Sequence, residues 1–247
     1  MSRTLSMNAL STLIKLVALV SLPFVAFGQM DSENSLILEG REALEKDGPE
    51  GLKRHESKAS QMARKAVVRE GDRLTLRLRS GKIKTFTDRP ECASGDIVVH
   101  VECMVYRLSA YARSRGLFVV IEGHHEGGRY ILVDDRSGQE TKIDAIRGVV
   151  LLSRSGNLLL VCLENDEVRG FEVQVWRRNR NSYVEEWFGS PFYDRNSYIS
   201  YSVLRWSSEG VIEMQARINQ PVILRNFTLR LLKGKWEVAT PPAQRTQ

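Results

Sequence analysis

One strand pattern recurs four times along this chain, and it limits the possible fold more than any other feature. Each copy has a strand of alternating apolar and polar residues, a turn containing Gly, Asn or Ser, and a second strand. The copies are Leu74 to Phe86, Tyr130 to Ile143, Phe171 to Trp187 and Phe227 to Val238. Alternation places apolar side chains on one face of a strand, so each copy predicts an antiparallel hairpin. We therefore expect a mainly β fold.

The last three copies are each preceded by another hairpin. In each of these, a polar turn with a glycine leads into an apolar strand, within Ala112–Val120, Leu152–Leu160 and Arg205–Ile212. The glycine permits the positive backbone angle of a tight turn. The apolar run after the turn favours a strand that is buried on both faces.

Two hairpins in series make a four-stranded unit of roughly 40 to 55 residues, the size of a propeller blade. Over about Tyr106 to Thr240 this pattern resembles the blades of WD-repeat-type β-propellers in bacterial exported proteins, although the Trp-Asp dipeptide is absent. The resemblance implies antiparallel four-stranded blade-like repeats, in a partial or small β-propeller, and nothing about chemistry. Strands at Leu74–Phe86 and from Ile97 could complete a fourth blade; the alternatives are a sheet that stays open and a sheet that a second subunit closes. An antiparallel β-sandwich is the alternative.

The stretch before the repeats has a helical pattern. Leu52, His55, Ala59 and Met62 recur at steps of three or four residues, and Gly48-Pro49 divides the stretch in two. We expect a short N-terminal helical segment made of two helices, with a mobile tail as the alternative. We predict four segments along the chain: residues 1–28 form a signal peptide, 29–66 a helical or flexible lead-in, 67–240 a β-repeat domain and 241–247 a flexible tail.

The N-terminus has the order of a secretory signal peptide. Arg3 and Lys15 precede an apolar run from Leu16 to Phe27, and small residues at Ala26 and Gly28 suit a signal peptidase. A membrane anchor is the alternative, but the run is shorter than the ~20 residues of a spanning helix. No cysteine lies near the cleavage site, which argues against a lipoprotein. We expect an exported protein, periplasmic or extracellular.

Composition narrows the classes further. Apolar residues make up 42% of the 247 residues and charged residues 27%, which excludes a largely disordered chain and a polytopic membrane protein. The net charge is +6, and it becomes +4 when Arg3 and Lys15 leave with the signal peptide. This modest charge suits an anionic surface, such as lipid head groups or cell-wall polymers. Export makes nucleic acid an unexpected partner.

Export also decides how the three cysteines are interpreted. An oxidising compartment allows disulfides, and Gly95-Asp96 is suited to turn the chain between Cys92 and Cys103. We expect a Cys92–Cys103 disulfide. Cys162 lies in an apolar strand, where a buried free thiol is expected.

One short segment has the residue types of a metal site. His124, His125 and Glu126 suit zinc or copper, but they precede Gly127-Gly128 between two apolar strands. A solvated hairpin turn fits that position better, and adjacent histidines in a strand point to opposite faces. We expect no cofactor.

Two segments are candidates for binding a partner. Arg177 and Arg178 follow Trp176 at a hairpin turn, and Arg73, Arg77 and Arg79 form a second basic strip that would strengthen a polyanion site if the two met. The partner-binding candidates are Trp187, Phe188, Phe192, Tyr193, Arg177 and Arg178. The aromatics lie in a loop between repeats, where they fit a partner surface. Core packing between blades is the interpretation that burial statistics favour for these aromatics, and this loop is the first candidate if any surface binds a partner.

The chain contains none of the familiar catalytic motifs, such as Gly-x-Ser-x-Gly or His-Glu-x-x-His. We therefore predict an exported non-catalytic binding or scaffold module for a protein or envelope component. One alternative is an exported hydrolase or metal-dependent enzyme, for which Asp134-Asp135 and Asp166-Glu167 are the paired acids. The other alternative is a cationic binder of anionic polymers. The oligomeric state is not predicted.

Overall fold

The computed structural model describes residues 31–89, 104–124, 127–145, 148–165, 170–192, 198–219 and 222–240. Helix α2 (Ser32–Ala63) and the short 3-10 helix η1 (Arg64–Ala66) come first, and strands form the rest of the structure. Among these residues no helix has the length and apolarity needed to cross a membrane. The predicted signal peptide lies outside the described residues.

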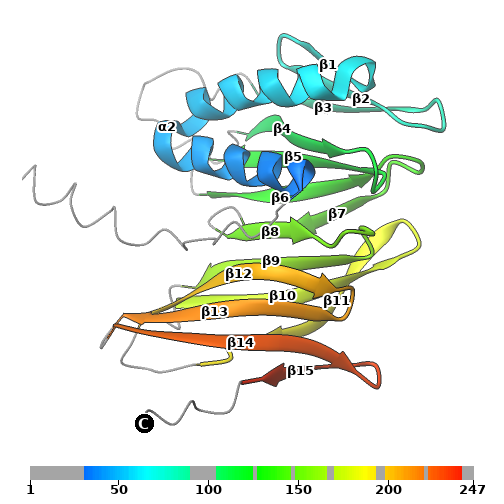
Figure 1. Cartoon of the computed structure of the whole chain (residues 1–247). Helices are drawn as coiled ribbons and strands as arrows, with labels where there is room; N and C mark the ends of the chain where they lie inside the picture. The colour runs from blue at the N-terminus through cyan, green and yellow to red at the C-terminus, as the bar shows by residue number, and fades with distance from the viewer. Residues whose placement is uncertain are drawn as a thin grey trace, which may run out of the picture.

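The described strands form four antiparallel sheets, which we call blades 1 to 4 (Figure 1). Blade 1 contains β1 (Val67–Glu70), β2 (Arg73–Arg77) and β3 (Ile83–Thr87). Blade 2 contains β4 (Met104–Ala112), β5 (Leu117–His124), β6 (Gly127–Asp134) and β7 (Glu140–Ile143). Blade 3 contains β8 (Val149–Leu152), β9 (Leu158–Asn165), β10 (Gly170–Asn179) and β11 (Ser182–Gly189). Blade 4 contains β12 (Ile199–Ser208), β13 (Val211–Asn219), β14 (Val222–Leu232) and β15 (Lys235–Ala239).

Blade-like repeats are therefore confirmed. The four recurring hairpins correspond to β2–β3, β6–β7, β10–β11 and β14–β15, and their strands do not close into a barrel. Blades 3 and 4 are joined by a single parallel pair, Gly170 with Ile199. The strand expected from Ile97 lies largely within 90–103, outside the described residues.

Blade 3 is buried on both faces. Val150, Leu152 and Val161 belong to one hydrophobic core with blades 1 and 2. Their neighbours Val149 and Leu151 belong to a second core with blade 4. A two-layer sandwich buries one face of each sheet, so this stack of sheets differs from the sandwich alternative.

Helix α2 doubles back on itself. Lys58 forms an ion pair with Glu39, 19 residues earlier, whereas a straight helix would separate them by about 28 Å. Figure 1 shows the two arms side by side, and the helix contacts β4 and β8. Gly51 is required at the reversal because a Cβ there would lie 2.1 Å from the Ala43 carbonyl oxygen. The predicted pair of short helices is present as this hairpin.

Candidate functional site

Side chains of α2 complete the hydrogen bonds of two strand edges. The Asn34 amide donates to the Leu152 carbonyl and accepts from the Leu152 N–H, both at 2.8 Å. The Glu56 carboxylate accepts from the Leu108 N–H at 2.9 Å, and His55 Nε2 donates to the Ser109 carbonyl at 2.8 Å. Exposed strand edges invite pairing with other chains, so these contacts both anchor α2 and protect β4 and β8.

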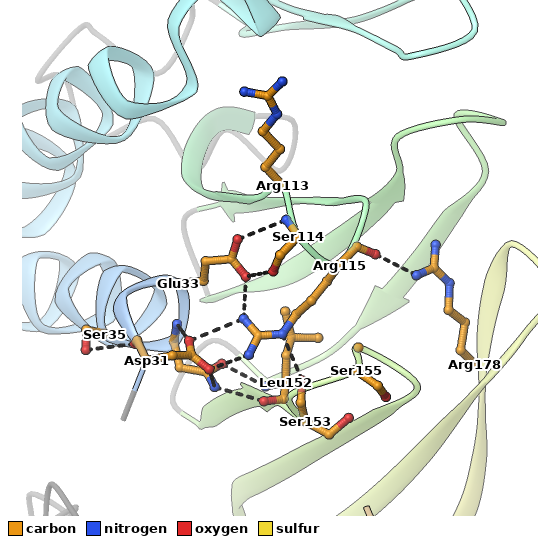
Figure 2. A network of polar contacts seen from close by, with 12 residues as sticks. Asp31, Glu33, Ser35, Arg113, Ser114, Arg115, Leu152, Ser153, Ser155 and Arg178 are labelled. Carbon is orange, nitrogen blue, oxygen red and sulfur yellow. Dashed lines mark hydrogen bonds and ion pairs between the residues drawn. The ribbon is translucent and has the colours of Figure 1, made fainter. Parts of the chain in front are cut away.

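Arg115 ties the start of α2 to the turns of blades 2 and 3 (Figure 2). Its side chain is only 3% exposed, and its guanidinium pairs with Asp31 and Glu33 and donates to the Ser153 carbonyl at 2.8 Å. Asp31 also caps α2 by accepting from the Asn34 N–H at 2.9 Å. Burial raises the pKa of Asp31, but the bonds from Arg115 and Asn34 outweigh burial and lower it overall.

The paired acids Asp134 and Asp135 lie close to the Arg115 contacts, and both form ion pairs of their own. Asp134 forms an ion pair with Arg178 and accepts from the Ser137 N–H at 2.7 Å. Asp135 pairs with Arg79 Nε at 2.7 Å and accepts from the Tyr111 hydroxyl at 3.0 Å. These carboxylates stabilise turns, and the other predicted acids, Asp166-Glu167, lie outside the described residues.

A groove of about 1270 Å³ opens next to the contacts that Arg115 makes with Asp31, Glu33 and Ser153. It lies between the end of α2, the end of β2 and the β4–β5 turn. Its lining residues are Glu33, Met62, Ala63, Arg64, Lys65, Ala66, Arg77, Arg79, Tyr111, Arg113 and Ser114. Five of these side chains are basic and one is acidic, so the groove carries a strong positive field.

Among the described residues, four of the five cations have no counter-charge. Arg79 pairs with Asp135 and donates to the Arg113 carbonyl. The exposed side chains of Arg64, Lys65, Arg77 and Arg113 make no hydrogen bond or ion pair with any described residue. In Figure 2 the Arg113 guanidinium points away from the Arg115 network, toward the second arm of α2. The groove is therefore an anion-attracting surface.

Arg64 is placed by an unusual backbone. Its φ of 53° and ψ of −129° end α2, and its N–H bonds to the Gln61 and Ser60 carbonyls. Non-glycine residues seldom adopt positive φ, and such conformations cluster at functional sites.

The structure brings together only part of the predicted basic surface. Arg77 and Arg79 line the groove, whereas Arg73 does not. Arg177 pairs with Glu186 and Arg178 with Asp134, so that run is neutralised locally. Sequence reasoning missed Arg64, Lys65 and Arg113. Their only signal was a basic residue at an element's end.

The predicted aromatic partner surface is divided. Trp187 and Phe192 are partly buried and pack against the core of blades 3 and 4, with Phe192 edge-on to Phe227 at 5.2 Å. This is the core-packing alternative for those two residues. Phe188 is 51% exposed, and Tyr193 lies outside the described residues.

The remaining candidates give little at this site. His125, Glu126, Cys92 and Cys103, together with the His124 side chain, lie outside the described part of the chain. The described residues hold no group of three or more His, Cys, Asp or Glu that suits a metal ion. Cys162 is a buried free thiol, as predicted, and burial raises its pKa to about 12.

No protein-family model, curated protein or solved structure matches this chain. The resemblance to WD-repeat propellers thus stays a prediction beyond the observed blades.

Proposed function

We propose that this protein is a non-catalytic binding module that captures an anionic partner in the groove between α2, β2 and the β4–β5 turn. The observation that supports it is the gathering of Arg64, Lys65, Arg77 and Arg113, four cations without a counter-charge among the described residues. Holding like charges together costs free energy, and a bound anion removes that cost. Binding by this field would weaken as salt is added.

The N-terminal segment supports export, and we carry that expectation into the proposal. The partner would then be an anionic protein or an envelope component rather than nucleic acid. The hydrolase alternative is less well supported, because Asp134 and Asp135 are occupied by Arg178 and Arg79. A pair of catalytic carboxylates has to face a cleft.

A direct test titrates the protein with polyphosphate at increasing NaCl. We expect binding that falls steeply with salt, and a loss of at least about tenfold in the Arg77→Glu/Arg113→Glu variant. The matched control is Arg73→Glu/Arg230→Glu, which makes the same charge change on exposed strand positions outside the groove. Absent binding, or an equal loss in both variants, would contradict the proposal.

A further inference from the structure

A carboxylate of the chain itself already occupies one end of the groove. Glu33 accepts from the Ser114 N–H at 3.1 Å and from the Ser114 hydroxyl at 2.8 Å, and it pairs with Arg115 (Figure 2). Ser114 is exposed, and the Glu33 side chain is 21% exposed. The Ser114–Arg115 turn thus supplies an N–H, an O–H and a guanidinium, a donor set that fits a carboxylate.

We infer that the groove binds an acidic peptide segment of a partner protein, and that Glu33 is an internal competitor for the Ser114 end. This inference rests on the proposed function and names its ligand. A partner's carboxylate would take the place of Glu33 on Ser114, while its other acids would lie along Arg113, Arg77 and Arg64.

The apolar part of the lining favours a peptide over a bare polyanion. Met62 is 55% exposed, and Ala63, Ala66 and Tyr111 line the groove among the cations. A polyphosphate chain would satisfy the charges and leave Met62 in water. A peptide in which acidic and apolar residues alternate would cover both kinds of surface. The groove also exceeds the ~300–1,000 Å³ of small-molecule pockets, which suits an extended segment.

Glu33 can be removed from the competition without isolating Arg115. Asp31 pairs with the same guanidinium and accepts bonds from it, so Arg115 keeps a counter-charge when Glu33 is neutralised. The Glu33→Gln variant should therefore fold and bind an acidic peptide more tightly. A partly exposed ion pair contributes up to ~1 kcal/mol, so we expect a gain of about two- to fivefold in affinity.

The experiment measures anisotropy of a short fluorescein-labelled peptide in which Glu alternates with Leu. Wild type, Glu33→Gln and the control Glu39→Gln are compared, since Glu39 pairs with Lys58 outside the groove. A second peptide with Leu replaced by Ser tests the apolar contribution, and unlabelled polyphosphate serves as a competitor. Thermal melts verify that each variant is folded.

Tighter binding by Glu33→Gln alone, together with weaker binding of the Ser peptide, is the expected result. If polyphosphate binds through Arg77 and Arg113 but the Glu-Leu peptide does not, the peptide inference fails and the proposed function stands. Equal affinities for wild type and folded Glu33→Gln would overturn the role of Glu33. If neither probe binds, both proposals fail.

Discussion

Blades 3 and 4 have the same strand order, but their strands differ in the pattern of apolar and polar residues. In blade 3, every residue of β8, Val149 to Leu152, is at most 2% exposed, because blades lie on both sides of it. In β13 of blade 4, Ile212, Met214 and Ala216 are buried, while Glu213 and Gln215 alternate with them on the outer face. The connectivity of a blade therefore does not reveal its position in the stack, whereas its apolar periodicity does.

Polar contacts follow the same division. Arg115 is buried where α2 meets blades 2 and 3 and has two acidic partners. On the outer face of blade 4, Arg205 is 65% exposed and pairs with Glu213 at 2.8 Å. Buried pairs are costly to break and exposed pairs contribute little, so we expect stability to depend on the interior of the stack.

Introducing a carboxylate into each blade should give the largest difference in stability effect between blades 3 and 4. Val161 is fully buried against the core of blades 1 to 3, so Val161→Asp leaves an unpaired carboxylate there at a cost of several kcal/mol. Against a total stability of about 5–15 kcal/mol, we expect little soluble folded protein. Gln215→Asp on blade 4 loses the side-chain bond to Asn226 and should change stability by about 1 kcal/mol or less. Soluble yield measures the Val161→Asp effect, and urea unfolding followed by tryptophan fluorescence measures the stability of every variant that is soluble. An equally large loss for Gln215→Asp would show that this face of blade 4 is also an interior surface.

Replacing the buried Arg115 and the exposed Arg205 should give the next largest difference in stability. Arg115→Met removes a buried cation and leaves Asp31, Glu33 and the Ser153 carbonyl without it, so we expect a loss of about 3–5 kcal/mol. Arg205→Met should cost at most about 1 kcal/mol. The measurement is the unfolding free energy of each variant in urea. A small loss for Arg115→Met would mean that α2 is held by its apolar contacts and strand-edge bonds alone.

The blades were predictable from sequence because strand burial depends on a local period of two residues. The hairpin at Leu74–Phe86 and the doubly buried run at Leu158–Leu160 could both be recognised from a few residues. The groove could not be predicted in this way. Its lining comes from α2, β2 and the β4–β5 turn, and no local pattern specifies which charged residues meet there.

The aromatic segment also shows that a local pattern does not specify which residues meet in the fold. Its composition is compatible with a partner surface as well as a core, and the packing of Phe192 on Phe227 places that side chain against the core. Similarly, Asp134 and Asp135 are paired acids in sequence, but their partners Arg178 and Arg79 are more than 40 residues away along the chain.

The smallest expected effect is a pH dependence of stability that comes from the α2–blade 2 contact and not from blade 4. Burial lowers the pKa of His55 against blade 2, despite the bond to the Ser109 carbonyl and the nearby Glu39, while 198–240, which includes blade 4, contains no histidine. Because the folded-state pKa lies below the unfolded value of about 6.5, the unfolded chain takes up the proton first as pH falls. The unfolding free energy should therefore decrease from about pH 6.5 downward, by at most ~1.4 kcal/mol per pH unit, until the folded-state pKa is passed. His55→Gln keeps an N–H donor for Ser109 and removes this titration, so its stability should depend less on pH in urea unfolding measured from pH 7.5 downward. If wild type and variant lose stability in parallel, the pH dependence comes from another group and the α2–blade 2 contact is insensitive to it.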